Sequence, residues 1–359
     1  MSRIVVTLGP ATAPPEVLEQ VVKAGADSFR FPASKASVAS LAALASRVSS
    51  VAAGLGRSPD LLLDLPGAKT RFTNDDQFSL AGLSHLQVHF GPVPSDVHRD
   101  VPVLGLTGSD ISALVGPGDI ILIGDGEDAL RVERVEADHC VATPLSAGFL
   151  GKRRGVALPG KSVPPSGLTD TDRAALQTLP GSLFSAVIIS FVESADSVRE
   201  ARAVMAAAAQ GRHAVPPVIA KVETQAGAAA VREIAACADA VLLGRGDLLL
   251  DCGPIEFFDL CENVRAATAE AGCPLIVGTQ LLTSLSAGWM PHRSELAYVS
   301  GLLRENTAGL MLADETAAGT APVRTVELLR ELRERYCASP DPAPLFSARA
   351  GAAAGRGGV

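Results

Sequence analysis

The feature that most constrains the fold is a regular alternation of short apolar runs with longer stretches of helical period. The short runs are rich in Val, Ile, Leu and Ala, and the longer stretches repeat apolar residues at the spacing of one helix face. Strands that alternate with helices form parallel sheets, and eight such units close into a ring. We therefore predict an α/β protein, a (β/α)8 TIM barrel. The predicted strands are 3–8, 27–31, 60–64, 185–190, 216–221, 239–243, 274–277 and 308–312, and the predicted helices are 14–24, 36–53, 169–178, 194–209, 226–236, 253–271, 279–304 and 321–336.

The alternation breaks after the third predicted strand. Residues 72–158 contain Pro- and Gly-rich turns and strand patterns such as Ile120–Ile123. We interpret this segment as an inserted all-β domain, a β-barrel lid that hangs from the catalytic end of the larger barrel and excludes water when it closes. The barrel domain then consists of residues 1–71 and 159–337. The Pro-, Ala- and Gly-rich residues 338–359 are expected to form a disordered tail.

Composition narrows the class of partner. The chain carries a net charge of -8 over 359 residues and is 47% hydrophobic. An acidic protein lacks the basic face that nucleic acid or an anionic membrane favours, so neither is expected as a partner. No leader-like segment follows Met1, no apolar run has the length of a membrane span, and the six cysteines are scattered. We expect a cytoplasmic protein with reduced, buried thiols.

Three charged residues lie at the ends of apolar runs. Lys221 and Glu223 close the fifth predicted strand, and Asp247 follows the sixth. The carboxyl ends of barrel strands face one shared mouth, so these side chains are expected to converge although they are distant in sequence. Carboxylate oxygens are the ligands that Mg²⁺ or Mn²⁺ prefers, and an ammonium beside them holds an anionic group. The alternative for Glu223 and Asp247 is a pair of surface salt bridges, and for Lys221 it is an outer strand end.

Gly246 and Asp247 are predicted to open a turn whose backbone N–H groups face outward. Such groups bind a carboxylate as a helix N-terminus binds an anion. Thr279 follows the seventh predicted strand and adds a hydroxyl. The competing interpretation is that Thr279 only caps a helix over 279–286.

Several short motifs occur in the order in which they occur in pyruvate kinases, and this chain resembles that family over about residues 3–335. The resemblance implies Mg²⁺-dependent movement of a phosphoryl group between phosphoenolpyruvate, or a related enol phosphate, and ADP. It includes the inserted segment but not the family's C-terminal regulatory domain. The motifs are Thr7-Leu8-Gly9-Pro10-Ala11, Lys221-Val222-Glu223, Gly246-Asp247-Leu248, Gly278-Thr279-Gln280 and Pro291-His292-Arg293-Ser294-Glu295.

The resemblance also implies roles for individual residues. Glu223 and Asp247 match the divalent-metal ligands, and Gly246, Asp247 and Thr279 match the groups at the substrate carboxylate. The expected catalytic residues are Lys221, Thr279, Arg30 and Glu315, and the expected substrate-binding residues are Arg30, Lys221, Gly246, Asp247 and Thr279. The expected nucleotide-binding residues are Pro10, Arg30, Arg71 and Arg154. A solvated charge run remains the alternative for Arg154 and its basic neighbours.

The most informative departure from the family concerns a monovalent cation. Of the four oxygen-bearing residues that hold K⁺ in many members, only Ser34 and Asp64 match, because Pro32 and Leu65 replace the other two. Lys69 stands where potassium-dependent members have glutamate. An ammonium supplies the same single positive charge as K⁺, so we expect Lys69 to replace the ion and K⁺ not to be required.

Other departures fall near the nucleotide and at the last strand. Lys35 replaces the usual histidine, Ser40 stands where an aromatic residue is expected, and Ala313 replaces a serine implicated in proton delivery. Asp314 or Glu315 is then expected to organise a proton-relaying water.

Three functions stay open from the sequence. The first is phosphoryl transfer from an enol phosphate to ADP, with phosphoenolpyruvate, pyruvate, ADP and ATP as partners. The second is an Mg²⁺-assisted aldol cleavage or enolisation of a 2-oxo acid without nucleotide, and the third is a catalytically silent homologue. A homo-oligomer is compatible with all three.

Overall fold

The protein is described here by a computed structural model of residues 1–95, 101–161, 167–179, 183–305, 307–337 and 345–346. Eight parallel strands close into a barrel in the order β1-β17-β16-β15-β14-β13-β3-β2, which confirms the predicted TIM barrel. The barrel strands consist largely of buried apolar residues, as strands covered on both faces require. The barrel strands are β1 (Arg3–Thr7), β2 (Ser28–Pro32), β3 (Asp60–Asp64), β13 (Ala186–Ile189), β14 (Val218–Val222), β15 (Ala240–Gly244), β16 (Leu275–Gly278) and β17 (Gly309–Leu312).

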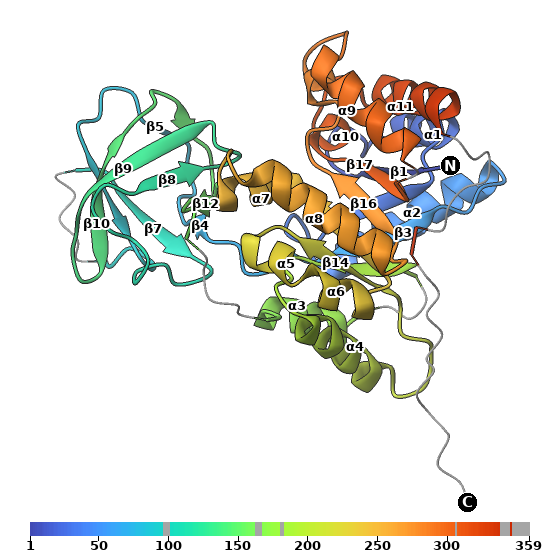
Figure 1. Cartoon of the computed structure of the whole chain (residues 1–359), viewed down its shortest axis with the longest axis horizontal. Coiled ribbons are helices and arrows are strands. Elements are labelled where there is room, and N and C mark those ends of the chain that lie inside the picture. The colour runs from blue at the N-terminus through green and yellow to red at the C-terminus, as the bar shows by residue number, and fades with distance from the viewer. Residues whose placement is uncertain (96–100, 162–166, 180–182, 306, 338–344, 347–359) are drawn as a thin grey trace, which may run out of the picture.

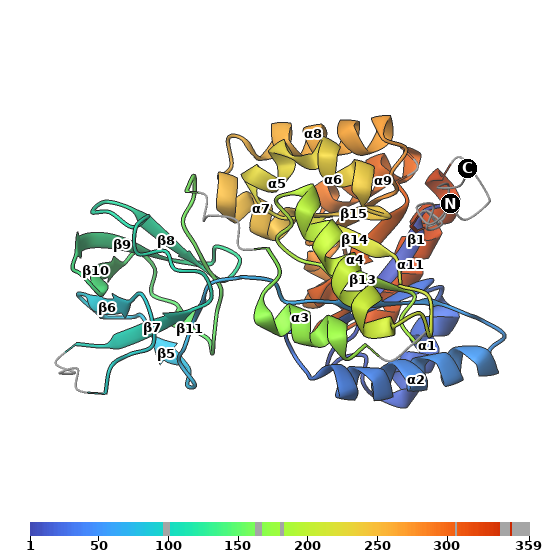
Figure 2. The ribbon, with the colours of Figure 1, turned by 90° about the horizontal axis from the view of Figure 1, so that it is seen from below.

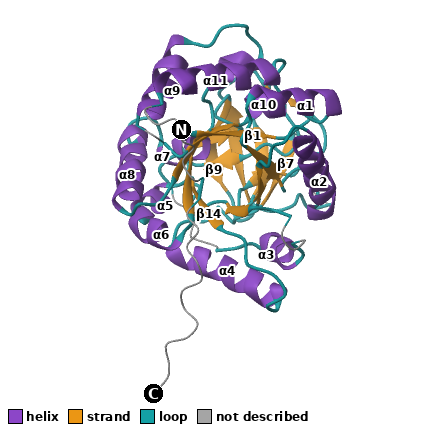
Figure 3. Cartoon of the chain, turned by 90° about the vertical axis from the view of Figure 1, so that its right-hand side faces the viewer, coloured by secondary structure: helices purple, strands orange, loops and turns teal. Residues whose placement is uncertain are grey.

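Helices surround the ring of strands, as the end-on view in Figure 3 shows. Their apolar faces and the outward-facing strand residues form one continuous core. The helices are α1 (Pro15–Ala24), α2 (Val38–Gly54), α3 (Asp170–Gln177), α4 (Ala195–Ala209), α5 (Gln225–Ala229), α6 (Val231–Cys237), α7 (Arg245–Cys252), α8 (Phe257–Glu270), α9 (Arg293–Arg304), α10 (Asp314–Ala317) and α11 (Pro322–Tyr336), with a 3₁₀ turn η1 (Thr283–Ser286).

Local sequence explains where several helices begin. Thr169 and Asp172 form a capping box at α3, in which each side chain bonds the other residue's backbone N–H. At α9 the Glu295 carboxylate accepts from the backbone N–H of His292 at 2.9 Å and from that of Ser284 at 2.9 Å. The Pro-His-Arg-Ser-Glu motif therefore starts a helix and also fixes the loop that follows β16.

The predicted helix over 279–304 was wrong in its first half. Thr279 and Gln280 have φ angles of 70° and 53°, which no right-handed helix allows, and only the short η1 precedes α9. Because no helix begins at Thr279, the alternative role of Thr279 as the cap of a helix over 279–286 is also wrong. The helix predicted over 226–236 is split into α5 and α6, and α7 and α10 were not predicted.

The segment between β3 and α3 folds into a separate β-unit beside the barrel (Figures 1 and 2). Its seven-stranded sheet has the order β12-β8-β9-β10-β6-β7-β4, and β11 pairs with β5. An isolated bridge between Arg71 and Gly155 joins the two edges of the large sheet around a second core. The strands are β4 (Arg71–Phe72), β5 (Phe78–Ser79), β6 (Leu86–His89), β7 (Val103–Thr107), β8 (Ile120–Ile123), β9 (Asp128–Val135), β10 (His139–Pro144), β11 (Phe149–Leu150) and β12 (Val156–Ala157).

The tail prediction was wrong for Leu345, which is 2% exposed and packs among the residues that fill the barrel interior. A Cβ on Gly309 would lie 2.6 Å from the Leu345 side chain, so the glycine makes room for it. Apart from Leu345 and Phe346, the predicted tail lies outside the described residues. Among the described helices, none combines the length and apolarity that crossing a bilayer takes.

Candidate active site

Lys221 and Glu223 lie at the carboxyl end of β14, as the sequence predicts. The Lys221 ammonium lies 2.7 Å from a Glu223 carboxylate oxygen, and the two side chains are 11% and 2% exposed. The second Glu223 oxygen accepts from the backbone N–H of Phe191 at 3.2 Å. A buried pair with this geometry is held in one orientation before any ligand arrives.

Asp247 lies in the first turn of α7, directly after β15. Two glycines, Gly244 and Gly246, allow the ends of neighbouring strands to approach each other closely. A Cβ on Gly244 would meet the Glu223 side chain at 2.7 Å, and a Cβ on Gly246 would meet the Thr279 side chain at 2.8 Å. The structure therefore brings Glu223, Asp247, Gly246 and Thr279 together from three consecutive strand ends.

Arg245 is a positioning residue that the sequence reasoning missed. Its guanidinium donates to the carbonyl oxygens of Gly278 at 3.2 Å and Gln280 at 2.9 Å, and also to that of Thr279. Thr279 is β-branched, so its positive φ is strained and requires such support. The arginine also covers the Tyr298 ring, 4.3 Å from its centroid. An arginine directly before Gly246-Asp247 was the available signal.

Arg30 projects from β2 and pairs with Asp64 at the end of β3. Its Nε and Nη2 lie 2.6 Å and 2.5 Å from the same Asp64 oxygen, and Nη1 donates to the Thr7 hydroxyl at 3.3 Å. The other Asp64 oxygen accepts from the Ser190 hydroxyl at 3.2 Å. Arg30 thus stands at the mouth with its fork already oriented.

The structure corrects the expected partner of Lys69. Its ammonium lies 2.5 Å from Asp247, and the cation that contacts Asp64 is Arg30. Ser34 lines a different cavity, beside Lys35. Lys69 therefore contributes its charge at a predicted metal ligand rather than between the two matched residues of the monovalent-cation site.

Burial and neighbouring charges set the protonation of Glu223, Asp247 and Lys221. Burial raises the pKa of Glu223 to about 7, an effect that Lys221 opposes and Asp247 reinforces. Burial also acts to raise the pKa of Asp247, but the ammonium groups of Lys69 and Lys221 outweigh it and lower that pKa. Burial acts to lower the pKa of Lys221, and Glu223 and Asp64 outweigh it and raise that pKa. At neutral pH the lysine and Asp247 are charged.

The donor set fits a hard divalent cation. Glu223 and Asp247 line the same cavity, and burial and the Asp247 charge both raise the pKa of Glu223. A cation between two neighbouring carboxylates relieves their repulsion. Both offer oxygen, the ligand atom that Mg²⁺ and Mn²⁺ prefer, and two protein carboxylates leave the other positions for substrate and water.

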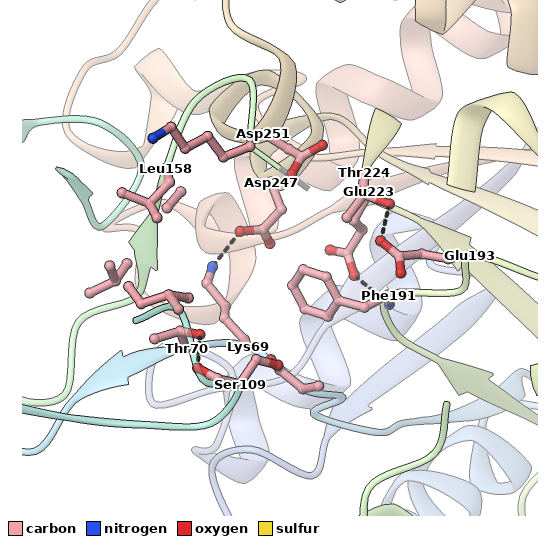
Figure 4. A pocket seen from close by; sticks show the side chains of 15 residues that line it. Lys69, Thr70, Ser109, Leu158, Phe191, Glu193, Glu223, Thr224, Asp247 and Asp251 are labelled. Carbon is pink, nitrogen blue, oxygen red and sulfur yellow. Dashed lines mark hydrogen bonds and ion pairs between the residues drawn. The ribbon is translucent and has the colours of Figure 1, made fainter. Parts of the chain in front are cut away.

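A cavity of about 90 Å³ opens beside these groups, between the barrel mouth and the β-unit. Figure 4 shows Lys69 and Asp247 meeting across it, with Glu223 beside Phe191. Its other acid groups are Glu193, which accepts from the Thr224 hydroxyl at 2.8 Å, and Asp251, which accepts from the backbone N–H of Gln225 at 2.7 Å. Burial raises the pKa of both.

The residues predicted to bind nucleotide are spread more widely. Arg71 lines a second cavity, of about 540 Å³, together with Ser34, Lys35, Lys152 and Arg153. Four cations in one cleft suit a polyphosphate. The other three predicted residues do not line this cleft. Arg30 pairs with Asp64. Arg154 pairs with Glu127 at 2.6 Å, and Pro10 is exposed in the loop after β1.

Glu315, which the resemblance predicts to be catalytic, lies buried among backbone N–H groups. The side chain is 1% exposed, and one oxygen accepts from the backbone N–H groups of Leu281 and Leu282 at 3.0 and 3.1 Å. The other oxygen accepts from the N–H of Ala313 at 2.7 Å. These bonds make Glu315 a positioning residue for the loop after Thr279. Asp314 beside it is exposed.

Comparison with known proteins gives the family. The family model for the pyruvate kinase barrel domain matches residues 1–326. The chain belongs to the pyruvate kinase family. It is 31% identical to a pyruvate kinase of Agrobacterium vitis over 93% of this chain and 69% of that protein, and 28% identical to one of Aeropyrum pernix over 93% and 70%. A pyruvate kinase of Thermococcus litoralis is also 28% identical, over 92% of this chain and 68% of the relative.

Proposed function

We propose that this protein transfers a phosphoryl group between phosphoenolpyruvate, or a related enol phosphate, and ADP. In the direction of ATP formation, the bond between phosphorus and the enol oxygen breaks, a bond to the terminal ADP oxygen forms, and the enolate takes a proton to become a 2-oxo acid. The observation that carries the proposal is the buried ion pair of Lys221 and Glu223 beside Asp247 at one end of the barrel. Phosphoryl transfer depends on such positioned charges rather than on a covalent intermediate.

Each group has a defined task in this reaction. The Lys221 ammonium stabilises charge on the transferring group and on the developing enolate, and Arg30 clamps a phosphoryl oxygen. The N-terminal backbone groups of α7 at Gly246 and Asp247 hold the substrate carboxylate, with the Thr279 hydroxyl on the facing loop. Bound Mg²⁺, held by Glu223 and Asp247, supplies neutralising charge.

The nucleotide is proposed to lie along the basic cleft. Arg71, Lys152 and Arg153 offer cations there, and Arg154 reaches the same side if its pair with Glu127 opens. We also propose that the β-unit acts as a lid over the mouth, because its residues Val156 and Leu158 already line the cavity that contains Glu223 and Asp247.

The direct test incubates the protein with Mg²⁺, phosphoenolpyruvate and ADP and detects ATP and pyruvate as products. Equal amounts of both are expected, and Lys221→Ala should abolish them because the substituted alanine cannot stabilise the charge. Arg212→Ala is a suitable control, since within the described ranges this exposed side chain hydrogen-bonds only backbone carbonyls at the end of α4.

Two outcomes would replace the proposal. Exchange of the pyruvate methyl protons in D₂O, or cleavage of a larger 2-oxo acid, without any ATP formation would indicate the nucleotide-free enolising function. No turnover and no shift in melting temperature with any of these ligands would indicate a silent homologue.

We further propose that the activity does not require K⁺, because Pro32 and Leu65 offer no side-chain oxygen and the Arg30 guanidinium already contacts Asp64. Rates in a buffer free of sodium and potassium should change little on addition of KCl. A many-fold rise with KCl, absent with an equal concentration of tetramethylammonium chloride, would contradict this.

A further inference from the structure

Two histidines and an aspartate meet in the β-unit, on strands that lie away from the barrel in Figures 1 and 2. His89 ends β6 and His139 begins β10, and the antiparallel register of these strands pairs the two residues directly. Their rings stack with centroids 5.0 Å apart and planes 22° apart. Asp138 precedes His139 in the turn from β9, so all three side chains lie at one end of the sheet.

The polar atoms of this cluster converge on one point. Nδ1 of His139 lies 2.8 Å from one Asp138 oxygen, and Nδ1 of His89 lies 3.6 Å from the other. One ligand atom from each residue can be chosen so that all lie within 4.8 Å of one another. Ligands bound tetrahedrally at about 2.0–2.1 Å from Zn²⁺ lie about 3.3 Å apart. Small side-chain adjustments therefore suffice to reach coordination distances.

His89 is a buried residue whose ring nitrogens are poorly paired. It is 4% exposed, and a neutral imidazole has one N–H and one lone pair. Its Nε2 has no hydrogen-bond partner within the described part of the chain. With the proton on Nε2, that N–H is unpaired and the Nδ1 lone pair faces the Asp138 carboxylate. With the proton on Nδ1, the bond to Asp138 is long and the Nε2 lone pair is unpaired.

We propose that His89, Asp138 and His139 form a binding site for a borderline divalent transition metal of the Zn²⁺ type. Two imidazoles and a carboxylate are suitable ligands for Zn²⁺, and three protein ligands leave a position for water. A cation at Nδ1 fixes the His89 tautomer with its proton on Nε2, and it takes up the Nδ1 lone pair that would otherwise face the Asp138 carboxylate. The site joins β6 to the turn between β9 and β10, and it is separate from the carboxylates at the barrel mouth.

The site is tested with metal-free, tag-free protein titrated with Zn²⁺ by calorimetry and with Co²⁺ by visible absorption, both in excess Mg²⁺. Mg²⁺ occupies the oxygen ligands at the barrel mouth and competes poorly for imidazole. Wild-type protein should bind one ion that His139→Gln and Asp138→Asn bind at least about 10–100-fold more weakly, since even outer-shell changes cost that much.

His85→Gln is the matched control, because His85 is an exposed histidine of the same β-unit whose side chain, among the described residues, bonds only its neighbour Ser84. It should bind the ion as wild-type protein does. Asp138 is 65% exposed, so Asp138→Asn should keep the fold, which circular dichroism verifies. Equal Zn²⁺ and Co²⁺ affinity in all four proteins, or no binding by wild type, would overturn the proposal. Turnover with Mg²⁺ alone should be the same in all four, so loss of the proposed kinase activity would be a separate result.

Discussion

The barrel and the β-unit present their charged side chains to the active-site cavities in different ways. In the barrel, Lys221 and Glu223 are 11% and 2% exposed and are held at the end of a strand. In the β-unit, Lys152 and Arg153, which line the basic cleft, are 67% and 69% exposed. Buried charges are fixed by packing and weakly screened, whereas exposed ones are mobile and screened by salt. The carboxylates proposed to hold the metal are thus preorganised, and the cleft proposed for the nucleotide has to be assembled around its ligand.

The largest effect is expected from the two buried carboxylates. Glu223→Gln and Asp247→Asn should each lower kcat about 10²–10³-fold, the cost of removing one preorganised electrostatic group. They should also raise the Mg²⁺ concentration needed for half-maximal rate. Steady-state kinetics across a Mg²⁺ series measures both. Rates within a few-fold of wild type would show that these residues do not hold the metal.

Lys69 links the two regions, because it follows β3 and contacts Asp247. Lys69→Gln should tighten Mg²⁺ binding roughly 10-fold, since the ammonium no longer competes for that carboxylate. Calorimetric titration with Mg²⁺ measures the change. Lys161→Gln is the matched control, because Lys161 lines the same cavity but pairs with Asp119. Weaker binding in Lys69→Gln would mean that the lysine supports the ion rather than opposing it.

A smaller effect is expected on the nucleotide side. Arg154→Gln should raise KM for ADP roughly 2–5-fold and leave kcat nearly unchanged, because exposed charge pairs are worth about 1 kcal/mol or less. The rise should shrink at high salt. Arg134→Gln, which removes an exposed arginine paired with Glu136 in the same β-unit, should leave KM unchanged. A kcat loss as large as that of Glu223→Gln would remove the contrast between the two regions.

Replacing the buried thiol Cys261 should not affect turnover. The thiol should instead affect how the free energy of unfolding depends on pH. Burial raises the pKa of Cys261 from 9.0 to about 11. The folded state then keeps a proton that the unfolded state loses, so this stabilisation is fully present below pH 9 and is lost as pH rises through about 11. A shift of this size is on the order of 1–3 kcal/mol.

Urea unfolding below pH 9 and near pH 11 measures this effect. Cys261→Ala should lose less stability over this interval than wild type, and Cys237→Ala, which alters a half-buried thiol, should follow wild type. Parallel losses in all three proteins would show that Cys261 is not the group responsible.

Only some residues of the candidate site could be predicted from the sequence pattern. Lys221, Glu223 and Asp247 were predictable because each follows an apolar run, and strand ends of a barrel share one mouth. The place of Arg245 directly before Gly246-Asp247 was visible, but its bonds to the loop and the strained backbone of Thr279 were not predictable, because backbone carbonyls accept from a distant guanidinium only once the loops are folded. The bonds of Glu315 to Leu281 and Leu282 were not predicted for the same reason, since they depend on a loop in a segment that the sequence pattern predicts as helix.

The amino-acid order alone determined the barrel, because burying a parallel sheet on both faces demands continuous apolar runs, and that demand is written locally along the chain. Tertiary structure alone decided which charges meet. Lys69 could have neutralised Asp64 or Asp247, and the fold places it at Asp247. His89 and His139 are separated by a long stretch of sequence, and only the pairing of β6 with β10 stacks them. Side-chain contacts between distant segments depend on register and packing, which local periodicity does not encode.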